Sequence, residues 1–265
     1  MALLTVKFYS SILNRETQMN VILPTQSKNF DLQSSHTADT LKNYPVLYLL
    51  HGLGDSYEHW CSCTSIEQYV ENTGIAVIMP DGSTNWYTDM KKGERWRAFI
   101  GEELPAVCHE LFPQLSTKRE DTYIGGVSMG GYGAYALALT YPERYGAACG
   151  FSGAYTPFGD SIVTQLISHW TDVFGEQEEW LKSKNDLVYL SEQLISSGRP
   201  LPKLWMWCGF KDFLYRHSTD MRDHLQNIGW PDFHYEESEG DHSWIYWNMK
   251  SIPMLEWILE DRKTK

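Results

Sequence analysis

The sequence predicts an α/β fold in which a mainly parallel central sheet is flanked by helices. Two observations lead to this prediction. Short apolar runs alternate with helix-like segments along most of the chain, which is the pattern of successive βα units. Several of these runs, such as Val46–Leu50, are continuously apolar. Runs of this kind indicate strands that are buried on both faces of a sheet.

An antiparallel hairpin is expected near the N-terminus. Thr5–Ser10 and Met19–Leu23 have the composition of strands, and Asn14-Arg15-Glu16 lies between them. Residues 25–43 are rich in serine, threonine, asparagine and aspartate. We therefore expect a surface loop ahead of the first buried strand.

The remaining elements alternate between strand and helix. The predicted strands are Val46–Leu50, Ile75–Met79, the apolar run that leads into Gly125, Tyr145–Phe151, Lys203–Cys208 and Phe233–Glu236. The predicted helices are His59–Glu71, Ala98–Leu111 despite Pro105, Ala134–Thr140, Phe213–Ile228 and a last helix that ends near Leu259. Gly229 and the following Trp230-Pro231 supply the stop signal after Ile228.

One domain is predicted for residues 1–265, because the composition shows no break and α/β folds often reach this length. Residues 154–200 differ from the rest of the chain. There, short helical patterns alternate with polar turns, and Trp170, Phe174 and Trp180 recur. We interpret this segment as a small helical cap inserted above the sheet.

Charge and cysteine content restrict the partners and the compartment. The formal net charge is −12 and no basic run stands out, which argues against nucleic acid and anionic membranes as partners. The N-terminus does not resemble a signal peptide, and no apolar run is long enough to span a membrane. The five cysteines show no paired spacing, which is typical of reduced thiols. We therefore expect a cytoplasmic protein.

The segment around Ser128 carries the strongest motif. Gly126-x-Ser128-x-Gly130 follows an apolar run and precedes a helical pattern, which is the context of a nucleophile elbow. Glycines are expected here because side chains beside the serine would collide with the tight strand-to-helix turn. The turn exposes the hydroxyl and directs the Met129 N–H to the place where negative charge develops. We therefore predict Ser128 as a nucleophile.

A second glycine-containing turn follows the strand Val46–Leu50. His51-Gly52-Leu53-Gly54-Asp55 has the form of the turn that supplies the other half of an oxyanion hole. We assign the inward N–H to Leu53, and Gly52 and Gly54 are the alternatives one residue away. With Met129, Leu53 thus completes the predicted oxyanion hole.

Asp212 and His242 complete a candidate catalytic triad with Ser128. The order nucleophile, acid, base along the chain is that of the α/β-hydrolase fold, and each residue follows an apolar strand-like run. The three side chains are therefore expected at the carboxyl edge of one sheet. His242 would take the serine proton, and Asp212 would hold the imidazole tautomer and stabilise the imidazolium.

Other histidines and carboxylates fit this role less well. His51 fits the oxyanion turn, and His234 lies within a strand pattern. His217 and His224 have the pattern of exposed helical residues. Asp241 adjoins His242 and is expected to point elsewhere, and Asp186 belongs to the insertion.

Two further acidic groupings are assigned no chemistry. Glu102 and Glu103 are adjacent on a predicted helix and face different directions, which favours a solvated or capping role. His51, Asp55 and His59 have a metal-like spacing, but two glycines inside that segment argue against one helix that carries all three. We therefore predict no metal site.

Trp86-Tyr87 lies in a loop after the strand Ile75–Met79. Aromatic side chains near the carboxyl ends of strands either line an acyl pocket or pack against a cap. The sequence favours neither of these two interpretations.

The motifs together resemble the esterase D family of α/β-hydrolases, most closely the intracellular tributyrin esterases of bacteria. The resemblance covers nearly the whole chain. It rests on Phe8-Tyr9-Ser10, Asn20–Pro24, His51-Gly52-Leu53, Pro80-Asp81-Gly82, Trp86–Asp89, Glu103-Leu104-Pro105, Gly125–Gly133, Tyr141-Pro142-Glu143, Ser152-Gly153, Cys208-Gly209, Asp212 and Gly240-Asp241-His242. The resemblance implies a carboxylesterase without a cofactor that acts on short acyl chains, and family members often form oligomers. Relatives differ most in the region that corresponds to residues 154–200.

The predicted function is hydrolysis of short-chain acyl esters, of the tributyrin esterase or acetylesterase type, through an acyl-Ser128 intermediate. A feruloyl or cinnamoyl esterase is one alternative, because 14% of the residues are aromatic. An S-formylglutathione hydrolase is another. An inactive protein of this fold that binds a ligand is an alternative of a different class. The expected partner is a small-molecule ester, and a homo-oligomer is compatible with the resemblance.

Overall fold

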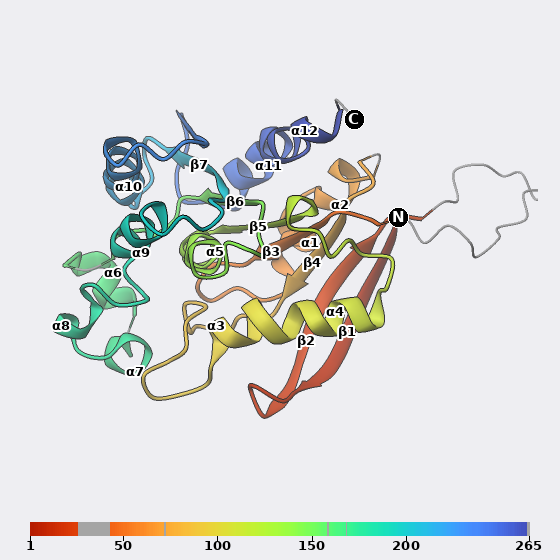
Figure 1. Ribbon diagram of the computed structural model, residues 1–265, viewed down its shortest axis with the longest axis horizontal. Coiled ribbons are helices and arrows are strands. Elements are labelled where there is room, and N and C mark those ends of the chain that lie inside the picture. Colours follow the sequence, from red (N-terminus) through yellow and green to blue (C-terminus); the bar gives the residue numbers. More distant parts are fainter. Residues whose placement is uncertain (26–42, 72, 158, 168, 264–265) are drawn as a thin grey trace, which may run out of the picture.

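The computed structural model describes residues 1–25, 43–71, 73–157, 159–167 and 169–263, and it is built around one twisted sheet (Figure 1). Within these residues the sheet has eight strands in the order β1-β2-β4-β3-β5-β6-β7-β8. The strands are β1 (Ala2–Ser10), β2 (Arg15–Leu23), β3 (Val46–Leu50), β4 (Ala76–Pro80), β5 (Thr122–Val127), β6 (Ala147–Phe151), β7 (Lys203–Gly209) and β8 (Phe233–Ser238). The strands from β4 to β8 in this order run parallel, while β1 and β2 are antiparallel to their neighbours. The predicted α/β class is confirmed.

Helices connect the strands. They are α1 (His59–Cys63), α2 (Ile66–Tyr69), α3 (Trp96–Ala98), α4 (Leu104–Leu111), α5 (Met129–Thr140), α6 (Ser161–Leu166), α7 (Trp170–Phe174), α8 (Gln177–Trp180), α9 (Leu187–Ile195), α10 (Tyr215–Asn227), α11 (Trp244–Ile258) and α12 (Glu260–Lys263). A π-helical turn, Phe99–Glu103, joins α3 to α4, and a short 3₁₀ turn, Arg119–Asp121, precedes β5. None of the described helices is both long and apolar enough to cross a lipid bilayer.

Two apolar cores cover the two faces of the sheet. Along β3, Val46, Tyr48 and Leu50 point into one core, while Leu47 and Leu49 point into the other. This alternation follows from the period of two residues in a strand. Every residue of β3, β4, β5 and β6 is buried, which explains why these strands read as continuous apolar runs.

The hairpin prediction is confirmed, but its strands are longer than predicted. β1 and β2 pair in register from Ala2 opposite Leu23 to Ser10 opposite Arg15. Much of β1 is exposed at the edge of the sheet, so the apolar pattern marks only part of the strand. The loop predicted over residues 25–43 lies almost entirely outside the described residues.

Two predicted helices are interrupted. The segment 98–111 contains the π-helical turn, because Pro105 has no N–H to donate to the preceding turn. The segment 59–71 is split into α1 and α2 at Thr64 and Ser65. There the Ser65 amide donates to Asn248 Oδ1 of α11 at 2.9 Å instead of continuing a helix.

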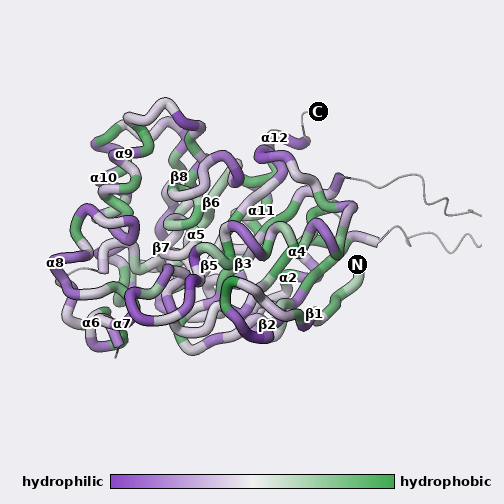
Figure 2. Tube along the Cα trace, turned by 60° about the horizontal axis from the view of Figure 1, so that its bottom comes forward, coloured by the Kyte–Doolittle hydropathy of each residue, from purple (hydrophilic) through white to green (hydrophobic). Residues whose placement is uncertain are grey.

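Residues 154–200 carry the helices α6 to α9, of which α9 lies beside α5 and α10 (Figure 1). Much of the stretch around α8 is hydrophilic (Figure 2), but its aromatic side chains point inward. The Phe174 ring lies 4.7 Å from both the Trp170 and Trp180 rings and 5.9 Å from the Trp86 ring. This aromatic cluster joins the segment to the loop after β4. That the segment is a cap within a single domain stays a prediction.

Candidate active site

Ser128 is the single residue that joins β5 to α5. Its φ of 56° and ψ of −117° place a residue other than glycine in a strained region of backbone space. The Ser128 amide donates to the carbonyl of Phe151 in β6 at 2.9 Å, which ties this turn to the neighbouring strand. The side chain is half-buried, so the hydroxyl remains accessible.

The glycines around Ser128 have no room for a side chain. A Cβ on Gly126 would overlap the backbone of Gly130, and a Cβ on Gly130 would overlap the carbonyl of Leu50 at the end of β3. The start of α5 is therefore packed directly on the turn that follows β3. This close approach places residues 51–55 next to Ser128.

His242 and Asp212 complete a hydrogen-bonded row with Ser128. His242 Nε2 lies 2.9 Å from Ser128 Oγ, and His242 Nδ1 lies 2.9 and 3.0 Å from the two carboxylate oxygens of Asp212. Asp212 is buried and also accepts from the Leu214 amide at 2.8 Å. A carboxylate at Nδ1 holds the proton on that nitrogen and leaves Nε2 free to accept the serine proton.

Two aromatic rings contact the imidazole, and the sequence did not predict either contact. The ring centroid of Phe213 lies 4.4 Å from that of His242, and the Trp247 ring meets the imidazole edge to face at 5.0 Å. Phe213 directly follows Asp212 and Trp247 lies in the first turns of α11. Proximity to the two predicted residues in the sequence was the available signal.

The turn after β3 presents amides to Ser128. The Gly52 amide donates to Asp55 Oδ2 at 3.2 Å, so it is already engaged. Among the described residues none accepts a hydrogen bond from the amide of Leu53 or Met129. The amides of Leu53 and Met129 are therefore free to donate to a bound oxygen atom, whereas the Gly52 amide is not.

His51 stabilises this turn through hydrogen bonds and makes none with Ser128. Its Nε2 accepts from the Gly82 amide at 2.8 Å, so the proton resides on Nδ1, which lies 2.8 Å from the Gly52 carbonyl. The Tyr87 hydroxyl donates to the His51 carbonyl at 3.0 Å. Burial opposes ionisation of the neighbouring Asp81, but the hydrogen bond that the Ser83 amide donates to its carboxylate at 3.0 Å helps to hold its pKa below the ordinary value.

A cavity of about 190 Å³ opens beside Ser128. It is lined by Ser128 and His242 together with Leu53, Trp86, Ala154, Val163, Leu166, Phe213 and Leu214. Apart from those two, the lining side chains are apolar. Trp86 both lines this cavity and packs against Phe174 and Tyr132. Tyr87 does not line the cavity, and its hydroxyl donates to the His51 carbonyl.

Four of the other candidate residues have structural roles. Glu103 accepts from the Ser10 hydroxyl and the Ser11 amide and so caps the turn between β1 and β2, and Glu102 accepts from the Tyr141 hydroxyl. Asp186 caps α9 through the Tyr189 amide at 3.2 Å. Asp241 accepts from the Ser243 hydroxyl and points away from the imidazole of His242.

The prediction that His217 and His224 are exposed is wrong. His217 is 3% exposed, and His224 is half-buried with its Nε2 2.9 Å from Ser191 Oγ. Both side chains lie on the side of α10 that packs against other segments. The polar composition of α10 conceals this packing, because the histidines are buried with polar partners.

His51, Asp55 and His59 do not form a metal site. His59 Nε2 lies 3.3 Å from Asp55 Oδ1, whereas the His51 ring is engaged with Gly82. In the part of the chain that the structure describes, no group of three His, Cys, Asp or Glu side chains is arranged to hold a metal ion.

Cys208 lies near Asp212 without being a second nucleophile. Burial, with a contribution from the Asp212 carboxylate, raises the pKa of its thiol to about 12. At neutral pH the thiol is therefore protonated, and a thiol of this kind is a weak nucleophile.

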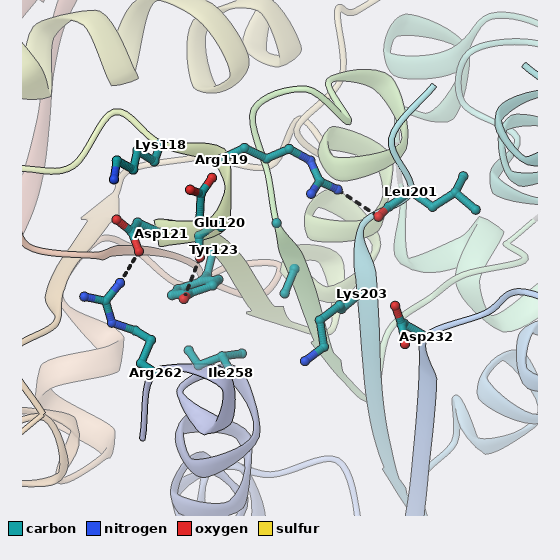
Figure 3. A pocket seen from close by; sticks show the side chains of 12 residues that line it. Lys118, Arg119, Glu120, Asp121, Tyr123, Leu201, Lys203, Asp232, Ile258 and Arg262 are labelled. Carbon is teal, nitrogen blue, oxygen red and sulfur yellow. Dashed lines mark hydrogen bonds and ion pairs between the residues drawn. The ribbon is translucent and has the colours of Figure 1, made fainter. Parts of the chain in front are cut away.

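A larger cavity, of about 610 Å³, lies at the amino ends of β5, β6 and β7, at the edge of the sheet opposite Ser128 (Figure 3). Two of its cations, Arg119 and Arg262, are engaged. Arg119 donates to the carbonyls of Pro142 and Leu201, and Arg262 pairs with Asp121. No nucleophile with a base beside it occurs among the residues that line this cavity, so we assign it no catalytic role.

Comparisons with known proteins agree with this geometry. Residues 10–258 match the model of the family described as "Putative esterase". An acetyl esterase of Caldicellulosiruptor saccharolyticus is 32% identical over 97% of this chain and 98% of its own length. The sequence similarity therefore extends through the segment 154–200 as well.

Solved structures show the same fold. The fluorophosphonate-binding serine hydrolase FphF of Staphylococcus aureus, in a substrate-bound form, superposes with a TM-score of 0.86 at 30% identity, covering 97% of this chain and 98% of that one. An S-formylglutathione hydrolase of the same organism, FrmB, superposes with a TM-score of 0.84 at 29% identity and the same coverage. The predicted α/β-hydrolase fold is confirmed.

Proposed function

This chain belongs to the esterase family whose model it matches over residues 10–258, and from that premise we propose that it is a serine carboxylesterase that hydrolyses short-chain acyl esters. The observation that carries the proposal is the row from Ser128 Oγ through the His242 imidazole to the Asp212 carboxylate, with all distances between 2.9 and 3.0 Å. The mainly apolar cavity that Ser128 helps to line supplies room for an acyl group.

The proposed reaction proceeds through an acyl-enzyme. His242 Nε2 takes the Ser128 proton as Oγ bonds to the ester carbonyl carbon, and the carbonyl oxygen becomes an oxyanion beside the Leu53 and Met129 amides. The C–O bond to the alcohol then breaks, and His242 returns the proton to the leaving alkoxide. Water, deprotonated by His242, attacks the carbonyl carbon of acyl-Ser128. The bond from this carbon to Ser128 Oγ breaks, the carboxylic acid is released, and His242 returns the proton to Ser128 Oγ.

Replacing the nucleophile tests the proposal. We expect Ser128→Ala to abolish turnover of p-nitrophenyl acetate and butyrate, with unchanged circular dichroism and thermal unfolding. Ser62→Ala, at an exposed serine on α1, is the matched control and should keep full activity. Retained ester turnover in folded Ser128→Ala would contradict the proposal.

A thioester substrate is the second candidate. The likeness to the S-formylglutathione hydrolase FrmB favours it, because that protein matches nearly the whole chain.

The feruloyl or cinnamoyl alternative rests on Trp86 and Phe213 in the wall of the cavity. We expect the purified wild-type protein to prefer p-nitrophenyl butyrate over ethyl ferulate and S-formylglutathione in a panel of kcat/KM values. A preference for either of the other two substrates would move the assignment to that class.

The alternative of an inactive binding protein is separated by covalent labelling. A fluorophosphonate probe should label wild-type protein at Ser128 and should leave Ser128→Ala unlabelled. Folded wild-type protein that neither reacts with the probe nor hydrolyses any ester of the panel would favour the binding function.

The proposed location is the cytoplasm. Cys61, Cys63, Cys108, Cys149 and Cys208 are all free thiols, as expected for a reducing compartment. Cell fractionation, with detection of the protein by antibody, tests this proposal.

A further inference from the structure

A second row of hydroxyl, imidazole and carboxylate lies outside the Ser128 site. His217 of α10 places Nε2 3.1 Å from Asp160 Oδ2, and its Nδ1 lies 3.2 Å from Thr156 Oγ1. The imidazole is 3% exposed. Thr156 lies in the loop between β6 and α6, away from any strand-to-helix turn, so we assign this row no nucleophilic role.

The two oxygens of Asp160 bind different parts of the fold. Oδ1 accepts from the amides of Ile162 and Val163 at 2.7 and 3.0 Å and so caps the N-terminus of α6. Oδ2 accepts from His217 of α10. One carboxylate therefore connects the first turn of α6 to a helix that packs on the sheet.

The proton positions in this row follow from its partners. Because Asp160 accepts from Nε2, that nitrogen carries the proton, and Nδ1 of the neutral imidazole accepts from the Thr156 hydroxyl. Burial lowers the pKa of His217, although Asp160 acts in the opposite direction. Both ring nitrogens are thus engaged, and both connect α10 to the segment that leads into α6.

α6 forms part of the wall beside Ser128. Val163, which is buried, and Leu166, which is 51% exposed, both line the cavity at the candidate nucleophile. The helix spans only Ser161–Leu166. A helix of this length is not stable by itself, so its position depends on its contacts with the rest of the protein.

We propose that Thr156, His217 and Asp160 form a latch that fixes α6 against the cavity and thereby determines which acyl chains the site accepts. The proposal rests on the proposed esterase function. With the latch intact, the side chains of Val163 and Leu166 limit the length of the acyl group that the cavity accepts. When the latch is broken, α6 moves more freely and longer acyl chains gain access.

A change in acyl-chain selectivity tests the latch. His217→Phe keeps a ring of similar size and removes both hydrogen bonds, while His217→Gln keeps a donor toward Asp160. We expect the kcat/KM ratio of p-nitrophenyl butyrate to octanoate to fall about tenfold in His217→Phe, mainly through a lower KM for octanoate, since one methylene group in an apolar pocket is worth at least that factor. His217→Gln should retain most of the wild-type ratio.

His224→Phe is the matched control. His224 lies on the same helix and contacts Ser191 of α9 at 2.9 Å, and neither residue lines the cavity. The butyrate-to-octanoate ratio of kcat/KM in His224→Phe should equal that of wild type. An unchanged ratio in folded His217→Phe, or an equal fall in His224→Phe, would overturn the latch. Should His217→Phe fail to fold, Thr156→Val removes one hydrogen bond with little change of volume, and its ratio should fall by a smaller factor.

Hydrogen exchange separates failure of the latch from failure of the esterase proposal. The amides of residues 162–166 should exchange at least tenfold faster in His217→Phe than in wild type and His224→Phe. This measurement needs no substrate. If the wild-type protein hydrolyses no ester, the proposed function fails while exchange still reports on the latch. Unchanged exchange at α6 would overturn the latch whatever the substrate.

Discussion

The indole of Trp247 meets the imidazole of His242 edge to face, with centroids 5.0 Å apart and ring planes at 89°. The indole N–H donates to Ser152 Oγ at 3.0 Å, and Ser152 and Trp247 are both buried. Since Phe213 also contacts the imidazole, the orientation of His242 depends on these neighbours as well as on Asp212. A small rotation of the imidazole would lengthen the 2.9 Å contact with Ser128.

Trp247→Phe removes the indole N–H and shortens the ring that supports His242. Under the proposed function we expect kcat for p-nitrophenyl butyrate to fall about tenfold with little change in KM, because misplacing a catalytic group by a fraction of an ångström costs rate and not binding. Trp244→Phe is the control. Trp244 lies on the same helix, but its ring contacts Trp60 and Trp247 and not the imidazole of His242. Equal kcat values for the two variants would contradict the role given to Trp247.

Gly126→Ala should destabilise the protein far more than Gly125→Ala. A Cβ on Gly126 overlaps the backbone of Gly130, whereas a Cβ on Gly125 meets the Leu49 side chain at 3.3 Å, which a small shift relieves. We expect a loss of about 3 kcal/mol or more in the free energy of unfolding for Gly126→Ala and about 1 kcal/mol for Gly125→Ala, in line with overpacking elsewhere. Urea unfolding of both variants measures the difference, and equal losses would contradict the packing argument.

His51→Ala should weaken the oxyanion turn and the fold together. It leaves the buried Gly82 amide without its acceptor, which costs about 1–3 kcal/mol. We expect that loss in thermal or urea unfolding, together with a lower kcat. His234→Ala, at an exposed histidine of β8, is the control and should change neither quantity. Full stability in His51→Ala would show that water replaces the imidazole at Gly82.

Thiol reactivity should differ strongly among the five cysteines at pH 8. Burial raises the pKa of Cys61 to about 11 and that of Cys108 to about 12, and it raises the pKa of Cys149 further. Cys208, near Asp212, has its pKa raised to about 12. A raised pKa means less thiolate at a given pH, and thiolate is the reactive form. These four thiols should therefore be slow.

Cys63 is exposed and should react first. We expect one thiol per chain to react rapidly with Ellman's reagent at pH 8 in the native protein and five in denaturant. Cys63→Ser should abolish the rapid phase. A second rapid thiol in the native protein would show that a buried cysteine is more accessible than its surroundings indicate.

The sequence predicted the fold well where the signal is local. Buried parallel strands leave continuous apolar runs, and the elbow leaves a glycine pattern, so β3 to β7 and the turn at Ser128 were recognised. Prediction was poorer where a distant contact decides the structure. The break between α1 and α2 depends on Asn248, which is far away in the chain.

In the candidate site, too, local signals were predicted and contacts between distant residues were not. The order of Ser128, Asp212 and His242, each after an apolar run, led to the expectation that they meet, and the structure brings them within hydrogen-bond distance. Their catalytic roles remain a proposal. Phe213, Trp247 and Ser152 were assigned no role in the site. Phe213 and Trp247 lie near Asp212 and His242 in the sequence, but proximity along the chain does not show which side chains contact the imidazole.

The sequence by itself determined the α/β class, the family resemblance and the residues that were worth placing, because periodicity, glycine spacing and motif order are properties of neighbouring residues. Only the tertiary structure decided that His217 is buried against Asp160, that Trp86 lines the cavity and also packs against Phe174, and that Gly52 has its amide engaged. These are contacts between side chains or turns whose geometry no local pattern encodes. They arise when packed helices and strands bring distant residues together, and packing of that kind is specified by the whole chain.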